Sequence, residues 1–446
     1  MKIYPHPSAS AEQCLKRIRG RELAFRSKDL AAVQRILQEV RKKGDEAVLA
    51  YTRRFDAPEM QPDQMAVTPA ETAAALRRVE PDVRRALNRA ADQIGAFHRQ
   101  QKPRAWVDTP RDGVMVGQLV HPVDAAGIYV PGGRAGTTPL VSSVLMTAIP
   151  AKIAGVGRVV MVTPPGRDGS VSPYLLAAAH KAGVDQVFKA GSAWAIAALA
   201  YGTQTIPRVD VIAGPGNIYV ALAKKLVAGT VRIDMIAGPS EILVIADDSA
   251  DPEHVAADLL SQAEHDPLAS AILVTDSAET ATAVQRAVKR QVAELERRDI
   301  AEQSLQAYGA LFVVHDLSAA VALANRIAPE HLELQVRDPF AWVGRIRHAG
   351  ALFVGPHTPE PVGDYVAGPN HVLPTAGTAR FSSALSVEDF IKTTSLIHYS
   401  PEALRAEARD IIRLAQIEGL EAHARSVQVR LSKARTANGK KGAAAK

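Results

Sequence analysis

Glu330 and His331 stand side by side in the stretch "NRIAPEHLELQV" and place a carboxylate next to an imidazole. An imidazole with a pKa near neutrality suits proton transfer, and a carboxylate beside it could act as a second base. Pro329 predicts an extended conformation for Ala328, and the alternating residues that follow predict a strand. Within a strand the two side chains would face opposite sides, whereas at a turn they could serve one reaction centre. The spacing leaves both interpretations open.

A second set of residues offers the donors of a metal site. In "DPEHVAADLLSQAEHDP" the two Asp-Pro pairs predict where a helix begins and ends. Gln262 and His265 would then lie three residues apart on one face of its last turn. Asp364, His371 and His423 add a carboxylate and two imidazoles, and this set suits zinc or a similar divalent ion. The alternative is solvated surface, since the sequence does not show that the side chains converge.

Strands and helices that must position these residues alternate through the middle of the chain. The segments "AGIYVPGG", "RVVMVTPP", "QVFKAG" and "VDVIAGP" are predicted strands, and "SSVLMTAIPAKIAGV" and "SPYLLAAAHKAGV" are predicted helices. Such alternation predicts an α/β fold with parallel sheets and helical crossovers. Residues 11–55, residues 69–101 and the stretch from Ser386 to Arg430 are instead predicted to be helical.

One motif occurs twice, in "VDVIAGPGNIYV" (209–220) and "IDMIAGPSEILV" (233–244). Both stretches contain the pattern hydrophobe-Asp-x-Ile-Ala-Gly-Pro, which predicts two strands that each end in a tight turn. Ligands of open α/β sheets bind beyond the carboxyl ends of strands, so these turns are candidate ligand sites, with purely structural turns as the alternative. The Pro/Gly-rich "VGPHTPEPVGDYVAGPNHVLP" is predicted to be a long and therefore functional loop.

Composition restricts the classes of protein that the chain can belong to. Its 446 residues suffice for two or three α/β-sized units, and no apolar run approaches the length of a membrane span. The formal charge is +6, but residues 430–446 hold six basic and no acidic side chains, and the remainder is balanced. The excess positive charge therefore belongs to a tail that is expected to be disordered. Because the rest of the chain is balanced, the composition argues against nucleic-acid binding. Cys14 is the only cysteine, so no disulfide can form within the chain, as expected for a cytoplasmic protein.

Two nucleotide-binding motifs are absent from the sequence. There is no G-x-G-x-x-G after a strand, and no G-x-x-x-x-G-K-[ST] phosphate loop. A thiol-dependent aldehyde oxidation is also disfavoured, because Cys14 lies in a predicted N-terminal helix, away from the Gly-rich turns.

Eight segments resemble the histidinol dehydrogenase family in content and order. They are "GIYVPGG", "SSVLMTAIPAKIAGV", "GPGNIYVALAK", "IDMIAGPSEILVIAD", "DLLSQAEHDP", "IAPEHLEL", "GDYVAGPNHVLPT" and "SSALSVEDF", and the resemblance extends over residues 20 to 430. It implies an NAD-dependent, zinc-requiring enzyme that oxidises L-histidinol through L-histidinal to L-histidine, the last step of histidine biosynthesis. A related zinc-dependent dehydrogenase acting on another hydroxy compound is the alternative.

The resemblance also implies roles for individual residues. His331 would take the hydroxyl proton in the first oxidation, and Glu330 would activate water for the second. One zinc ion per subunit would be bound by Gln262, His265, Asp364 and His423. The substrate would contact these four residues and His331, together with Ser240, His371 and Glu418.

The cofactor contacts implied for NAD+ are Tyr129 in "IYVPGG" and Asn217 in "GPGN". A third family position, usually glutamine, is Trp194 here, and the loop "RAGTTPLV" after Gly133 is longer than usual. Tryptophan cannot supply the amide, so an altered affinity for NAD+ is expected.

The family fold implies two incomplete Rossmann-like domains with parallel sheets, plus helical N- and C-terminal arms. The expected parts are an N-terminal arm (1–25), a first α/β domain with the metal and catalytic residues (26–127 and 238–384), a Rossmann-like cofactor domain (128–237), a C-terminal dimerisation arm (385–430) and a basic disordered tail (431–446). In the implied homodimer, the arm of one subunit lends Glu418 and His423 to the active site of the other.

Overall fold

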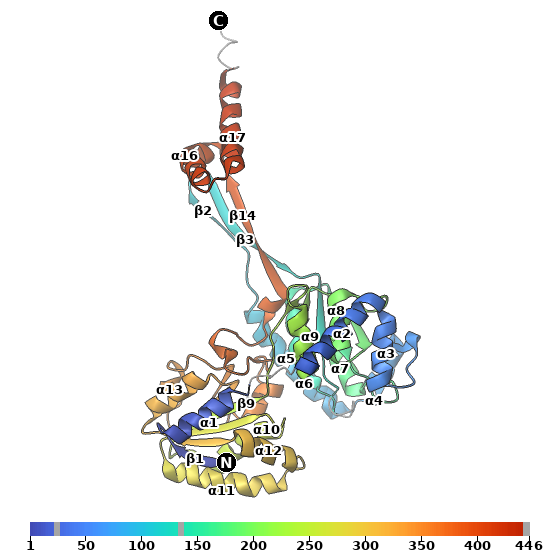
Figure 1. Cartoon of the computed structure of the whole chain (residues 1–446), viewed down its shortest axis with the longest axis vertical. Helices are drawn as coiled ribbons and strands as arrows, with labels where there is room; N and C mark the ends of the chain where they lie inside the picture. The colour runs from blue at the N-terminus through green and yellow to red at the C-terminus, as the bar shows by residue number, and fades with distance from the viewer. Residues whose placement is uncertain (22–26, 133–137, 440–446) are drawn as a thin grey trace. The chain divides into compact units, whose positions relative to one another are not determined.

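The structure, a computed structural model, describes residues 1–21, 27–132 and 138–439, with side chains to residue 431. These residues form two compact units (Figure 1). Among the described residues, the first unit comprises residues 1–21, 27–102, 122–132 and 138–390, and the second comprises residues 103–121 and 391–439. The expected α/β class with parallel sheets is confirmed in the first unit.

A six-stranded parallel sheet of the first unit carries the catalytic candidates. Its continuous apolar strands are buried on both faces, which is the usual reason for a parallel sheet to be covered by helices on either side. Helices α1 and α13 pack on one face, and α10, α11 and α12 pack on the other. The order is β1 (Lys2–Pro5), β11 (Ala310–Val313), β10 (Ser270–Thr275), β9 (Glu241–Ala246), β12 (His331–Gln335), β13 (Ala351–Val354). The helices are α1 (Ala9–Arg19), α10 (Pro252–Ala263), α11 (Ala278–Gln291), α12 (Arg298–Tyr308) and α13 (Leu317–Ile327).

The second parallel sheet of this unit has five strands. The chain runs outward from β4 through β5 to β6, then returns to the other side of β4 with β7 and β8. The order of the strands therefore reverses between β4 and β7, as it does in dinucleotide-binding folds. The strands are β4 (Ala125–Tyr129), β5 (Arg158–Thr163), β6 (Gln186–Lys189), β7 (Val211–Ala213) and β8 (Arg232–Ile233).

The helices of residues 27–100 pack with the five-stranded sheet, which differs from the expected assignment of residues 26–127 to the catalytic domain. The apolar faces of α2 and α3 join α8 and α9 in one core, and α4 and α5 contact α7 and α6. The N-terminal arm also differs, because β1 is a strand of the six-stranded sheet. The helices are α2 (Ser27–Lys43), α3 (Asp45–Phe55), α4 (Pro69–Arg78), α5 (Pro81–Gln100), α6 (Val141–Ala154), α7 (Pro173–Ala182), α8 (Ser192–Tyr201) and α9 (Ile218–Val227).

The second unit is a three-stranded sheet followed by two helices. The sheet has the order β14 (Ile391–Tyr399), β3 (Val114–Pro122), β2 (Trp106–Arg111), and the helices are α16 (Pro401–Ile417) and α17 (Glu421–Gly439). The prediction of continuous helix after Ser386 was wrong for β14, whose β-branched and aromatic residues favour a strand. Helix α17 continues to Gly439, so the first part of the predicted tail is helical, and residues 440–446 lie outside the described residues.

Several short helices complete the first unit. They are η1 (Pro62–Gln64), η3 (Val292–Glu294), α14 (Phe340–Val343), α15 (Glu360–Tyr365), η4 (Thr378–Arg380) and η5 (Val387–Phe390). Helix α15 lies within the predicted long loop. Across the described residues, no helix combines the length and the apolar character that crossing a membrane requires.

Candidate active site

The Glu330–His331 pair lies at a turn, not inside a strand. Helix α13 ends with Ala328 in the left-handed conformation, at φ 55° and ψ 62°, so the prediction of an extended Ala328 was wrong. The physical reason is the helix end, because the backbone N–H of Ala328 donates to the carbonyl of Ala324 and closes the last turn. Strand β12 begins at His331, and Glu330 precedes it. The His331 Nδ1 and Glu330 Oε2 atoms are 3.7 Å apart, so both side chains face one site.

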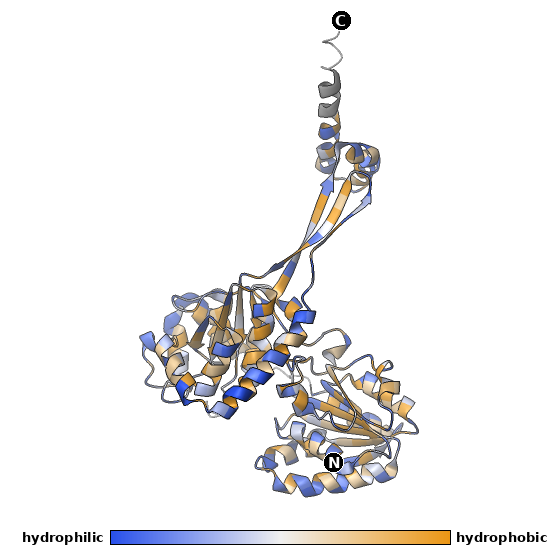
Figure 2. Cartoon of the chain, turned by 180° about the vertical axis from the view of Figure 1, so that it is seen from behind, coloured by the Kyte–Doolittle hydropathy of each residue, from blue (hydrophilic) through white to orange (hydrophobic). Residues whose placement is uncertain are grey.

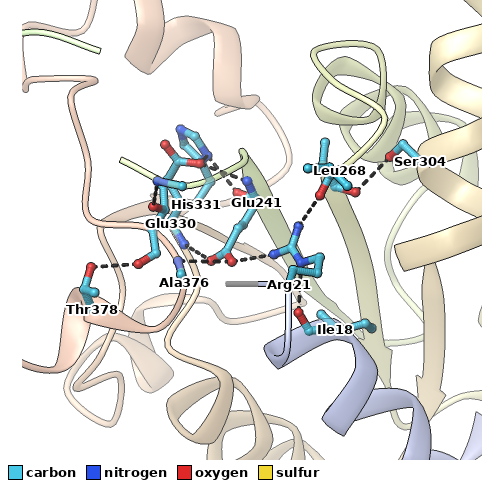
Figure 3. Close-up of polar contacts among 12 residues, drawn as sticks. Ile18, Arg21, Glu241, Leu268, Ser304, Glu330, His331, Ala376 and Thr378 are labelled. Carbon is cyan, nitrogen blue, oxygen red and sulfur yellow. Dashed lines mark hydrogen bonds and ion pairs between the residues drawn. The ribbon is translucent and has the colours of Figure 1, made fainter. Parts of the chain in front are cut away.

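The backbone of Glu241, the first residue of β9, holds both members of the pair (Figure 3). Its N–H donates to Oε2 of Glu330 at 2.9 Å, and its carbonyl lies 2.9 Å from Nδ1 of His331. A carbonyl only accepts hydrogen bonds, so Nδ1 carries the proton and Nε2 of a neutral ring keeps its lone pair. The arrangement therefore leaves Nε2 available as a base.

The side chain of Glu241 is anchored by Arg21, which follows α1 (Figure 3). Arg21 Nη2 donates to Glu241 Oε1 at 2.5 Å, and the N–H of Ala376 donates to the same oxygen at 3.2 Å. The N–H of Glu330 donates to Glu241 Oε2 at 3.3 Å. Arg21 makes two further bonds, to the carbonyls of Ile18 and Leu268. Both charges are thus buried and paired, the condition under which buried ions are tolerated.

Burial shifts the pKa values of the pair in opposite directions. Desolvation lowers the pKa of His331 to about 4, so the ring is neutral at physiological pH and able to accept a proton. Desolvation also raises the pKa of Glu330 well above its usual range, and the negative charges of Glu241 and Asp364 add to this effect. A carboxylate with a raised pKa is a stronger base than an exposed one. The site therefore contains a neutral imidazole, which can accept a proton but is a weaker base than a free one, and a carboxyl group whose ionised form is a strong base.

A group of possible metal ligands lies next to the pair. One ligand atom from each of His331, Glu360 and Asp364 lies within 4.8 Å of the others. Glu360 was not predicted from the sequence, although Glu360 and Asp364 stand four residues apart, a spacing that places both on one face of α15. Burial raises the pKa of Glu360 to about 8. Burial also opposes ionisation of Asp364, but its hydrogen bond to His371 and the charge of that ring lower its pKa.

Gln262 supports the prediction of a metal site through its unused hydrogen-bonding capacity. Both polar atoms of its side chain are buried without a hydrogen-bond partner among the described residues, and the same holds for Oε1 of Glu360. Buried polar atoms without partners are costly, so they indicate an absent ligand or ion. The sequence predicted His265 on the last turn of α10 beside Gln262, but the helix ends at Ala263 and His265 follows it and is exposed. Desolvation lowers the pKa of His265, and the negative charge of Asp364 opposes that shift.

A cavity of about 310 Å³ adjoins this group, with His331, Asp364 and His371 on its wall. His371 Nδ1 lies 3.5 Å from Asp364 Oδ1. Ser240 precedes β9, and its carbonyl accepts a bond from the N–H of Ser270. The volume lies at the small end of the range for ligand sites, which suits a metabolite rather than a macromolecule.

Glu418 and His423 belong to the second unit. Both are exposed, Glu418 at the end of α16 and His423 in α17. The roles that the resemblance implies for these two residues stay predictions.

The predicted cofactor residues Tyr129 and Asn217 line another cavity, of about 330 Å³. The hydroxyl of Tyr129 accepts from the N–H of Ser192, and Asn217 caps α9 by accepting from Tyr219 and Val220. Trp194 is not among the residues that line this cavity. It is buried, donates to Thr52 Oγ1 at 3.1 Å and stacks on Phe55, which does line the cavity. The lengthened loop comprises residues 134–141, of which 134–137 lie outside the described residues.

The two similar motifs differ in structure. The first ends β7 in the expected tight turn, where Gly214 has φ 119° and a Cβ would lie 2.2 Å from the carbonyl oxygen of Tyr129. The second was predicted as a strand and turn, but β8 ends at Ile233 and residues 234–240 connect the five-stranded sheet to β9 of the six-stranded sheet. Asp234 of this connection accepts from the N–H of Gly214 and thereby links the two motifs.

Comparisons with known proteins agree with the geometry. A family model described as histidinol dehydrogenase matches residues 21–431. The histidinol dehydrogenase of Oleidesulfovibrio alaskensis is 58% identical over 400 residues, and that of Syntrophotalea carbinolica is 59% identical over 399 residues. Each alignment covers 90% of this chain and 92% of the relative. A crystal structure of histidinol dehydrogenase from Elizabethkingia anophelis superposes with a TM-score of 0.91 at 36% identity, covering 98% of this chain and 99% of that one.

Proposed function

Because this chain belongs to the histidinol dehydrogenase family, we propose that it oxidises L-histidinol through L-histidinal to L-histidine, with NAD+ as the hydride acceptor in both steps. The observation that carries the proposal is the neutral His331, with Nε2 unprotonated, beside a buried Glu330 and a group of metal-ligand side chains. The reaction would take place in the cytoplasm as the last step of histidine biosynthesis.

In the first oxidation, Nε2 of His331 takes the proton of the substrate hydroxyl while the C–H bond gives its hydride to NAD+. The hydrogen bond from Nδ1 to the carbonyl of Glu241 holds the ring in the required tautomer. Burial keeps the ring neutral, which is the form that accepts a proton. The product of this half-reaction is the aldehyde.

In the second oxidation, Glu330 takes a proton from water as the water adds to the aldehyde. The resulting hydrate keeps one hydroxyl and one alkoxide oxygen, and loss of its hydride to a second NAD+ gives the carboxylic acid. The raised pKa of Glu330 makes its ionised form a stronger base than an ordinary carboxylate, and the N–H of Glu241, which donates to it, orients it. No thiol takes part, in agreement with the position of Cys14, which is buried in α1.

We propose zinc as the metal, bound by Gln262, His265 and Asp364 of one subunit and by His423 of its partner. The unpartnered amide of Gln262 and the carboxylate of Asp364 fit such an ion, and Glu360 is a further candidate donor. When bound, the ion would act as a template for the amino and imidazole nitrogens of the substrate. The protein side chains around it perform the proton transfers.

The second unit supports a homodimer. Ile397, Leu414 and Ile417 are each more than 60% exposed, and Figure 2 shows hydrophobic positions along the strands of this unit. Three large apolar side chains exposed on one small unit favour a protein interface there. In the proposed dimer, this unit of one subunit brings Glu418 and His423 to the active site of the other.

The test is NADH formation by the purified protein from L-histidinol, carried to completion with and without a chelator. Two NADH per histidinol, lost on chelation and restored by zinc, would support the whole proposal. The alternative is a related dehydrogenase for another hydroxy compound. It predicts no NADH from histidinol and activity with a different member of a panel of amino and hydroxy alcohols.

A further inference from the structure

The cavity of about 330 Å³ lies where a dinucleotide would bind. Tyr129 ends β4, Pro164 follows β5 and Asn217 follows β7, and all three line the cavity. These elements flank the point at which the strand order reverses, next to the carboxyl ends of the strands. The cavity would hold part of a dinucleotide, since its volume is at the small end of the range for ligand sites.

The carboxylate that usually recognises ribose is missing from its ordinary place. In most dinucleotide-binding domains, an acidic residue near the end of the second strand accepts hydrogen bonds from the adenosine ribose. The second strand here is β5, and prolines and Arg167 follow it. The acid of that loop, Asp168, turns away, because its Oδ1 accepts from the N–H and the hydroxyl of Ser170. Asp168 does not line the cavity.

Asp56 supplies a carboxylate to the same cavity from a different element. It follows the last residue of α3 and lines the cavity with Phe55 and Tyr129. Its Oδ2 is buried and has no hydrogen-bond partner among the described residues, and burial raises the pKa of Asp56 to about 7. Gly191 allows this approach, because a Cβ there would lie 3.1 Å from Oδ2 of Asp56 and 2.8 Å from Cβ of Pro164. A donor from a ligand would remove the cost of the unpartnered oxygen.

We infer that Asp56 accepts hydrogen bonds from the adenosine ribose hydroxyls of NAD+ and so selects NAD+ over NADP+, an inference that rests on the proposed function. A 2′-phosphate would lack the donor hydroxyl and would bring negative charge against the carboxylate. Arg167 on the same wall would then attract the pyrophosphate. The opposite assignment, with Arg167 binding a 2′-phosphate, predicts a preference for NADP+.

The experiment uses the full-length, zinc-loaded protein and two variants, Asp56→Ala and Asp56→Asn. Binding of NAD+, 2′-deoxy-NAD+ and NADP+ is measured by calorimetry without histidinol, and KM and kcat are then measured with histidinol. Loss of a hydrogen bond to a charged group predicts about 10- to 100-fold weaker NAD+ binding in Asp56→Ala. In Asp56→Ala the preference for NAD+ over NADP+ should be smaller than in the wild type, and kcat at saturating NAD+ should stay within about twofold of the wild-type value. The substitution should weaken binding of 2′-deoxy-NAD+ less than it weakens binding of NAD+.

The matched control is Asp168→Asn, which changes the acid of the β5 loop that does not line the cavity. It should leave the affinity for every nucleotide unchanged. Equal NAD+ affinity in wild type and Asp56→Ala would overturn the inference, as would a wild-type preference for NADP+ that Arg167→Gln removes. If Asp56→Ala does not fold, Asp56→Asn keeps the shape and decides by the same criteria. Because binding is measured without histidinol, a wrong substrate would appear only in the kinetic part.

Discussion

Arg21 and Glu241 are 220 residues apart in the chain, yet they form a buried ion pair with 2.5 Å between Nη2 and Oε1. The backbone of Glu241 in turn bonds to Glu330 and His331. The end of the N-terminal helix α1 is thereby connected to the proposed acid–base pair through one residue. Arg21 acts as a positioning residue in this arrangement, since it touches neither catalytic side chain.

Replacing Arg21 by methionine should therefore affect both stability and catalysis. An uncompensated Glu241 in a buried position is expected to cost about 3–5 kcal/mol in the free energy of unfolding. The variant should also lose kcat with little change in the KM for histidinol, because the catalytic side chains are misplaced while the cavity remains. Urea unfolding and steady-state kinetics measure the two effects.

The control for Arg21→Met is Arg326→Met. This change breaks an exposed ion pair between Arg326 of α13 and Glu12 of α1, the helix that Arg21 follows. It should change neither stability nor kcat noticeably. Arg21→Lys should recover part of the lost kcat because it restores the charge. An unchanged kcat in a folded Arg21→Met protein would show that Glu241 holds the pair without help.

Glu330→Gln should separate the two oxidations. The amide cannot take a proton from water, so oxidation of L-histidinal should slow by about 10²- to 10⁴-fold, while oxidation of L-histidinol to the aldehyde should persist. The measurement is NADH per substrate with each compound, together with trapping of the aldehyde. Equal losses in both steps would contradict the assignment of Glu330 to water activation.

Removal of the Gln262 side chain should weaken metal binding. Its buried amide has no partner among the described residues, so Gln262→Ala is expected to lower zinc affinity by about 10- to 100-fold. Zinc retained after dialysis against a weak chelator is the readout, with Gln186→Ala, at an exposed glutamine of β6, as the control. Full zinc retention in Gln262→Ala would exclude Gln262 as a ligand.

Asp56 should give the unfolding free energy a characteristic dependence on pH. Its pKa is raised to about 7 in the folded protein from an ordinary value of 3.8, so the folded state binds the proton more tightly than the unfolded state. The contribution of Asp56 to stability is therefore fully present below about pH 4 and is lost as the pH rises through 7. The difference in free energy of unfolding between Asp56→Asn and the wild type should therefore increase from about pH 4 to about pH 7 and then become constant. A difference independent of pH would refute the shift.

A mixing experiment tests the proposed exchange of residues between subunits. His265→Ala and His423→Ala should each be inactive, but in a mixed dimer one site would carry both defects and the other neither. Random reassociation should then restore about a quarter of wild-type activity. No recovery, in mixtures shown by mass spectrometry to contain mixed dimers, would place His423 in the site of its own subunit or outside the site.

Local patterns in the sequence predicted much of the fold and part of the site. Apolar runs and Asp-Pro caps are properties of neighbouring residues, so the strands around Tyr129 and the helix before His265 were recognisable without a structure. The family resemblance added the roles expected of Glu330 and His331. Strand β14 was missed because its polar and apolar residues also fit a helical pattern over a short stretch.

The tertiary structure decided which of these residues meet. Nothing local to Arg21 indicates Glu241 as its partner, because that contact depends on how α1 packs against the end of the six-stranded sheet. The turn at Ala328 brings Glu330 and His331 to one site, and it depends on how α13 ends. Sequence alone determined the class of fold and the chemical groups available, since periodicity and residue type are local. Convergence, burial and the resulting pKa shifts arise from contacts between distant segments, so only the folded chain determines them.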